Sequence, residues 1–119
     1  MCEKNLKERT KAFTINVLDL VDKLPFSTVN KVIANQLAKS GSSVGANYRA
    51  SLRARSDNEF LSKMNIVLEE ADESLFWLEI INEKGIIENK EIQPLIKEAN
   101  ELVAIFVTTI KNTRNRLNN

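Results

Sequence analysis

Residues that interrupt regular secondary structure are scarce in this 119-residue chain, which contains only three glycines and two prolines. Apolar side chains recur at spacings of three and four along the long segments between them, which places them on one face of a helix. Few breakers together with this spacing favour a small number of long helices over many short strands. We therefore predict one all-α domain over residues 1–119, which is long enough to bury a core.

Start and stop signals divide the chain into four helices. Pro25 ends the first helix, because proline disfavours helical geometry in the residue before it. Ser56 and Glu59 form a capping box that begins the third helix, and Gly85 ends it. The expected helices cover about residues 8–24, 28–54, 57–84 and 90–114. Because the connections are short, we predict an antiparallel up-down-up-down four-helix bundle.

Residue types that much enzyme chemistry needs are missing. Histidine is absent and Cys2 is the only cysteine, which excludes His-based triads, Cys/His zinc sites and an intramolecular disulfide. No apolar run approaches the roughly 20 residues of a membrane span, and the N-terminus lacks the apolar core of a signal peptide. We therefore expect a non-enzymatic, cytoplasmic protein with no catalytic residues, no cofactor, no metal site and no membrane partner.

The net charge of +1 hides a segregation of charge along the chain. Residues 39–63 carry five basic and two acidic side chains, whereas residues 64–101 carry three basic and ten acidic ones. Residues 102–119 carry three basic side chains and no acidic ones. This layout permits a polyanion-binding surface, and it equally permits electrostatic pairing between helices or subunits.

Four basic residues cluster around the second helix connection: Arg49, Arg53, Arg55 and Lys63. Such residues can contact phosphates, and we predict them as a binding site for RNA or DNA. No aromatic interleaving with them suggests base stacking; Tyr48 is near, and we expect it to pack in the core. Binding should therefore be directed at the phosphate backbone, weakly sequence-specific and sensitive to salt. An acidic helix of a neighbouring subunit could instead neutralise the same arginines.

Small residues recur every four positions in the second predicted helix. Gly41 and Gly45 stand beside this row and each cost about 1 kcal/mol inside a helix, so close packing should compensate for them. That packing can occur inside the bundle or across subunits, and we assign both glycines to the predicted oligomer interface. Asn47 borders the apolar stripe, and we expect a structural hydrogen-bonding role rather than a functional one, because a buried amide needs partners. The row of small residues comprises Ala34, Ala38, Ser42, Ala46, Ala50 and Ala54.

The third predicted helix is apolar over most of its circumference, which is typical of a helix that is buried on more than one side. Phe76 and Trp77 widen its apolar stripe, and aromatic residues are enriched at protein interfaces. We predict that both residues belong to a subunit contact. The alternative is that they only fill the core of the domain.

A family resemblance is carried by residues 36–50, which read Gln-Leu-Ala-Lys-Ser-Gly-Ser-Ser-Val-Gly-Ala-Asn-Tyr-Arg-Ala. This segment resembles the four-helix bundle protein family, whose members are encoded by intervening sequences in bacterial 23S ribosomal RNA genes. Residues 53–60 and 67–79 continue the resemblance, which covers roughly residues 10–110. Lys39 stands where the family often has arginine, and residues 48–50 replace the Ile-Ala-Glu-Gly ending of many members.

The resemblance implies a small protein that assembles into a pentamer around a central axis, so we expect a ring-like homo-oligomer. A relative within the family, the accessory variability determinant of diversity-generating retroelements, partners a reverse transcriptase and binds nucleic acid. By resemblance, the chain is expected to be a nucleic-acid or ribonucleoprotein accessory. The alternative is a protein-only scaffold or adaptor, for example for a reverse transcriptase, with no direct nucleic-acid contact.

Overall fold

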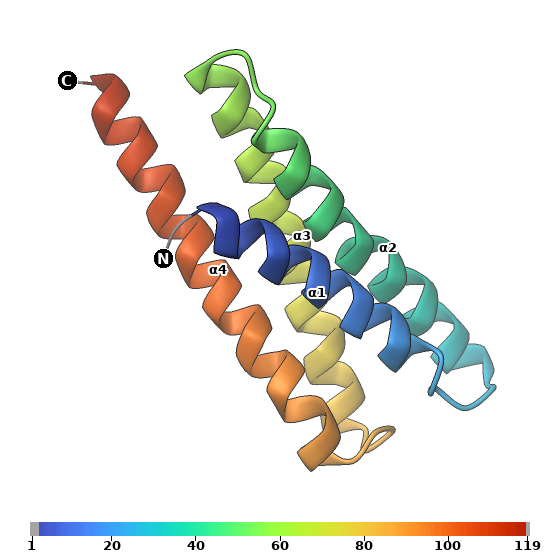
Figure 1. Cartoon of the computed structure of the whole chain (residues 1–119). Coiled ribbons are helices and arrows are strands. Elements are labelled where there is room, and N and C mark those ends of the chain that lie inside the picture. The colour runs from blue at the N-terminus through green and yellow to red at the C-terminus, as the bar shows by residue number, and fades with distance from the viewer. Residues whose placement is uncertain (1–2, 119) are drawn as a thin grey trace.

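Four helices make up the regular structure of residues 3–118, the part of the chain that this computed structural model describes; Cys2 lies outside it. They are α1 (Glu3–Val21), α2 (Thr28–Ser51), α3 (Asp57–Glu83) and α4 (Asn89–Asn118). Successive helices run in opposite directions and pack into an elongated bundle of 51 × 22 × 21 Å (Figure 1). The predicted all-α four-helix bundle is thereby confirmed. No helix in this part of the chain is long and apolar enough to cross a membrane.

Serine side chains begin two of the helices. Ser27 Oγ accepts a hydrogen bond of 2.9 Å from the backbone N–H of Asn30, and Ser56 Oγ accepts one of 3.0 Å from that of Glu59. Each bond satisfies one of the free amides in a first helical turn. Gly85 follows α3 with φ at +68°, in the left-handed region that side chains disfavour. Local capping chemistry therefore sets where α2 and α3 begin and where α3 ends.

The first helix begins earlier, and the last helix ends later, than the sequence predicted. α1 begins at Glu3 instead of near residue 8, because Leu6 is buried and adds a turn to the apolar stripe. α4 continues to Asn118 instead of ending near residue 114, and the buried Thr113 adds to its inner face. The other six boundaries lie within three residues of the predicted ones.

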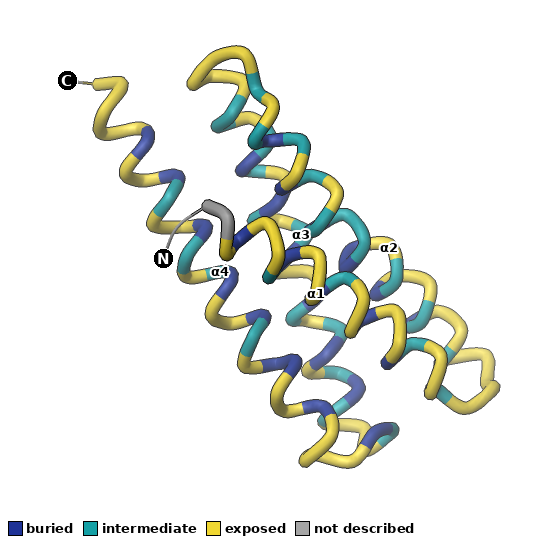
Figure 2. The backbone as a smooth tube through the Cα atoms, viewed as in Figure 1, coloured by how far each residue is buried: buried dark blue, intermediate teal, exposed yellow. Residues whose placement is uncertain are grey.

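The core consists of the inward faces of all four helices and runs along the axis of the bundle (Figure 2). Phe13 of α1, Leu37 of α2, Leu78 of α3 and Phe106 of α4 are fully buried. Tyr48 is also buried, and its ring centroid lies 6.1 Å from that of Phe106 at an interplanar angle of 26°. Tyr48 is therefore a core residue, as predicted, and does not face a ligand.

α1 and α2 approach each other closely at the two glycines of α2. A Cβ atom at Gly41 would lie 2.6 Å from Val17 Cγ1, and one at Gly45 would lie 2.6 Å from Thr14 Oγ1. Both distances are too short for a side chain, so only glycine fits without a shift of α1. The Thr14 hydroxyl donates to the Gly41 carbonyl at 2.7 Å and accepts from the Gly45 N–H at 3.2 Å. Of the two predicted alternatives, packing inside the chain accounts for both glycines without a second subunit.

α1 lies much less closely against α4 than against α2. The Arg9 guanidinium binds Glu98 through Nε at 2.9 Å and Nη2 at 2.5 Å, and it also contacts Glu101 at 3.2 Å. Near the other end of α1, Lys23 Nζ pairs with Glu91 at 2.5 Å. The N-terminus of α1 lies beside the middle of α4, so the ends of the other helices project beyond it (Figure 1). One end of the bundle is therefore built from α2, α3 and α4 alone.

Candidate nucleic-acid interface

The outward side of α2 carries only positive charges. α2 contains no aspartate or glutamate, and Ile33, Leu37 and Val44 fix the face that it turns toward the core. Basic residues recur at helical spacing on the opposite side of α2, and this row of basic residues continues into the connection between α2 and α3. Five exposed residues form what we call the basic face: Lys31, Lys39, Arg49, Arg53 and Arg55.

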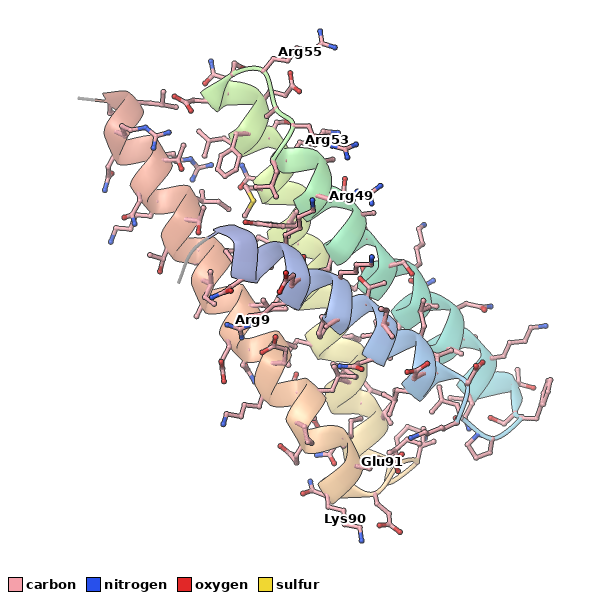
Figure 3. The ribbon with its side chains drawn as sticks, viewed as in Figure 1. Arg9, Arg49, Arg53, Arg55, Lys90 and Glu91 are labelled. Atoms are coloured by element: carbon pink, nitrogen blue, oxygen red, sulfur yellow. The ribbon has the colours of Figure 1, made fainter. Side chains whose placement is uncertain are left out.

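No residue of the basic face forms an ion pair within residues 3–118. Other cations of the bundle do pair, including Arg9 with Glu98 at 2.5 Å and Arg116 with Asp57 at 3.0 Å. The three arginines of the basic face follow one another along the end of α2 and its corner, and they project away from the bundle (Figure 3). Their charges are therefore accessible to a polyanion.

Lys63, the fourth basic residue predicted for this site, lies beside the arginine row. Its helical spacing from Ser74 places it on the side of α3 that faces α2, where Ser74 Oγ lies 2.9 Å from Ser40 Oγ. Lys63 is partly buried, whereas the three arginines are exposed. The structure thus brings the three predicted arginines into one outward row and leaves Lys63 at its margin.

Asn47 is occupied within its own helix. Its amide nitrogen donates to the Ser43 carbonyl at 3.1 Å and to Ser43 Oγ at 2.6 Å, one turn earlier in α2. The residue is partly buried. These bonds use its donor group inside the protein, which agrees with a structural role and keeps the amide out of the basic face.

The aromatic pair of α3 divides between surface and core. Phe76 is 51% exposed, whereas Trp77 is partly buried against the core. Their ring centroids lie 5.0 Å apart in an edge-to-face arrangement, and Trp77 Nε1 donates to Glu73 Oε2 at 3.4 Å. Both residues remain candidates for the predicted subunit contact. Further large apolar side chains are exposed on all four helices, among them Ile15 and Leu18 of α1, Val29 and Val32 of α2, Ile66 of α3, and Val107 and Leu117 of α4.

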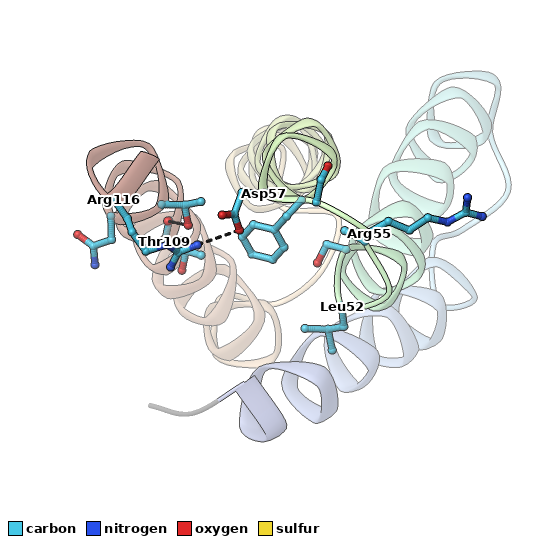
Figure 4. A pocket seen from close by; sticks show the side chains of 11 residues that line it. Leu52, Arg55, Asp57, Thr109 and Arg116 are labelled. Carbon is cyan, nitrogen blue, oxygen red and sulfur yellow. Dashed lines mark hydrogen bonds and ion pairs between the residues drawn. The ribbon is translucent and has the colours of Figure 1, made fainter. Parts of the chain in front are cut away.

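The three-helix end of the bundle contains an open cleft of about 660 Å³, which we call the end cleft. It lies between the α2–α3 corner and the last turns of α4 (Figure 4). Arg116 reaches toward Asp57 across it, whereas the Arg55 side chain extends away on the other side (Figure 4). The walls include Ser51, Phe60, Thr109, Asn112, Thr113 and Arg116.

The end cleft could not be found from the sequence, because no local motif marks it. It exists because α4 and the α2–α3 corner reach beyond the start of α1, which is a tertiary property. The available signal is the change along the inner face of α4, where the apolar stripe ends at Ile110 and Thr113 and Arg116 follow. Lys31 and Lys39 were also missed, although the lack of acidic residues between 28 and 51 pointed to them.

Both the sequence and the fold resemble known proteins. A family model described as 23S rRNA-intervening sequence protein matches residues 3–108. The crystal structure of a protein of unknown function from the S23 ribosomal protein family of Bacteroides thetaiotaomicron shares 28% sequence identity with this chain. The two structures superpose with a TM-score of 0.80, over 89% of this chain and 98% of that one. A search of the curated proteins found no match.

Proposed function

The chain belongs to the 23S rRNA-intervening sequence protein family, and from this premise we propose that it is a non-enzymatic, homo-oligomeric helical bundle that binds the phosphate backbone of nucleic acid. The basic face is the binding surface, with Arg49, Arg53 and Arg55 as its principal contacts. The family description refers to sequences that intervene in 23S rRNA, which makes RNA the first polyanion to test.

One observation carries the proposal: the basic face gathers exposed cations that no carboxylate of residues 3–118 neutralises. A polyanion can therefore bind there without first breaking an existing ion pair. Each arginine presents a planar fork of donors that matches a phosphate group. A row of such groups along one helix end suits the repeated charges of a nucleic-acid strand.

The chemistry of the surface sets the expected mode of binding. Phosphate contacts position a protein on nucleic acid but carry no sequence information. Binding through the basic face should therefore be weakly sequence-specific, and it should weaken steeply as the salt concentration rises, because bound counterions are released.

Assembly into a homo-oligomer is supported by the apolar surface that the single chain leaves exposed. Phe76, Ile15 and Val32 are each about half exposed, on three different helices. When large exposed apolar side chains lie together, the surface that they form is typically covered by a partner. In an oligomer, several basic faces would bind one strand and raise its apparent affinity.

Reversal of charge on the basic face tests the proposal. We expect Arg49→Glu/Arg53→Glu/Arg55→Glu to weaken the binding of a labelled RNA duplex at least roughly tenfold, because three attractive contacts become repulsive. Fluorescence anisotropy at low salt measures this loss. The fold should persist, because all three side chains are exposed and form no ion pair within the described residues.

A matched variant controls for net charge. Lys84→Glu/Lys90→Glu/Lys97→Glu makes the same change in charge at exposed positions away from the three arginines, and it should weaken RNA binding much less. Light scattering after size exclusion should give both variants the mass of the wild type. Equal weakening by the two variants, or unchanged binding by the arginine variant, would contradict the proposal.

A protein-only scaffold or adaptor is the second candidate, and the exposed aromatic ring of Phe76 favours it. The outward side of α3 is acidic at Glu69, Glu73 and Glu83, so the α3 of one copy could pair with the basic face of another. Capture of a defined protein partner without nuclease-sensitive material, together with no affinity for RNA, would favour this candidate.

A further inference from the structure

The end cleft has the size of a ligand site and touches the basic face. Its volume of about 660 Å³ lies within the range of roughly 300–1,000 Å³ that small-molecule sites occupy. Arg55 belongs both to the cleft wall and to the basic face. A strand that follows the arginine row therefore meets the mouth of the cleft at the α2–α3 corner.

The polar groups of the cleft divide into those already used and those open to a ligand. Ser51 Oγ donates to the Tyr48 carbonyl at 2.6 Å, and Thr113 Oγ1 donates to the Thr109 carbonyl at 2.8 Å. The side-chain amide of Asn112, by contrast, has no hydrogen-bond partner within residues 3–118. Its amide can therefore donate and accept at once, which is what the edge of a nucleobase requires.

Phe60 adds an aromatic ring to the same cleft. The residue is partly buried and packs against the core, so the ring is held in place while part of it remains accessible. Aromatic rings stack on unpaired bases whatever the identity of the base. Phe60 lies between Arg55 and Lys63 in the sequence, where no stacking role was predicted, and the fold brings it to the cleft that Arg55 borders.

Arg116 is the cation that an anion can reach inside the cleft. It lines the cleft together with the carboxylate of Asp57, whereas the Arg55 side chain extends away from it (Figure 4). The Arg116–Asp57 pair of 3.0 Å is exposed, with 65% and 48% of the two side chains accessible. Exposed pairs of this kind contribute little stability, so Arg116 can exchange Asp57 for a phosphate group at small cost.

We propose that the end cleft binds one unpaired nucleotide of a nucleic-acid strand held on the basic face. The base stacks on Phe60 and its edge is bound by Asn112, while Arg116 contacts the phosphate. A base inside a duplex cannot enter, because it is stacked on both sides and paired. This inference rests on the proposed function and adds to it a preference for strand ends, overhangs or bulged nucleotides.

Two RNA probes test the inference: a blunt duplex, and the same duplex with a three-nucleotide 3′ overhang. We expect wild-type protein to bind the overhang probe roughly tenfold more tightly in fluorescence anisotropy. Phe60→Leu keeps an apolar side chain and Asn112→Ala changes an exposed one, so both variants should fold. Each should remove most of the preference and leave the affinity for the blunt duplex unchanged.

DNA versions of both probes show whether the cleft accepts nucleotides of RNA and DNA alike. A preference for the overhang in either RNA or DNA supports the inference, and a preference confined to RNA assigns part of it to the 2′-hydroxyl.

Failure of the inference is distinguishable from failure of the proposed function. Equal affinity for the two probes, or a preference that both variants retain, would overturn the cleft site and leave the basic face standing. An overhang preference that survives Arg49→Glu/Arg53→Glu/Arg55→Glu, together with unchanged affinity for the blunt duplex, would uphold the cleft and overturn the basic face. No binding of either probe by the wild type would overturn both.

Discussion

The two glycines of α2 set the distance between α1 and α2. Val17 is fully buried, and its β-branched side chain occupies the space where a side chain at position 41 would stand. At position 45, the Thr14 hydroxyl takes the corresponding space and binds the α2 backbone. Each glycine costs about 1 kcal/mol of helix propensity, and the close contact with α1 offsets this cost.

Gly41→Ala should lower the free energy of unfolding by about 1 kcal/mol. Overpacking costs roughly 1–3 kcal/mol and alanine regains ~1 kcal/mol of helix propensity, so the middle of the range leaves a net loss. Urea unfolding measures the change. Asn35→Ala, at an exposed position of the same helix, is the matched control and should not lower stability. A Gly41→Ala protein as stable as the wild type would show that α1 can move away without loss.

At the scale of the helices, α1 packs closely on α2 and much less closely on α4. Arg9 of α1 and Lys23, just beyond its end, form ion pairs with α4. The hydrogen bond to Glu98 raises the pKa of Arg9, so this guanidinium stays charged. The position of α1 matters to the proposed cleft site, because the start of α1 defines where the end cleft begins.

Arg9→Gln should lower the free energy of unfolding by about 1–2 kcal/mol, because it removes charged hydrogen bonds and leaves the partly buried Glu98 without its cation. Hydrogen exchange should also become faster in α1 than in α2 or α3. Lys23→Gln, which breaks a more exposed pair, should have a smaller effect. Uniform exchange in all four helices of the Arg9 variant would contradict a specific role in holding α1.

Local patterns predicted most of the helices, and distant contacts decided the rest. Ser56 caps α3 through a bond to a residue three positions away, so the sequence contains all the information needed. The start of α1 depends on Leu6 being covered by other helices, which periodicity alone cannot tell from a frayed terminus. The arginine row of the candidate site was predictable because its members are neighbours in the chain. The end cleft was not, because it joins Phe60 to Asn112 across 52 positions.

The whole molecule separates its charges between neighbouring helices. The basic face covers the outward side of α2, whereas exposed glutamates cover that of α3, including Glu69, Glu73 and Glu83. A polyanion is therefore attracted to one side of the bundle and repelled from the next, which would orient it along α2 toward the end cleft. The same separation explains why a net charge of only +1 is compatible with phosphate binding.

The salt dependence of RNA binding tests the central claim most directly. The measurement is the slope of log association constant against log salt concentration for a duplex RNA, in the wild type and in Arg49→Gln/Arg53→Gln/Arg55→Gln. Each neutralised phosphate contributes about 0.9 to the slope, so loss of three contacts should reduce its magnitude by roughly 2–3. Identical slopes for the two proteins, or a wild-type slope near zero, would contradict phosphate binding through the basic face.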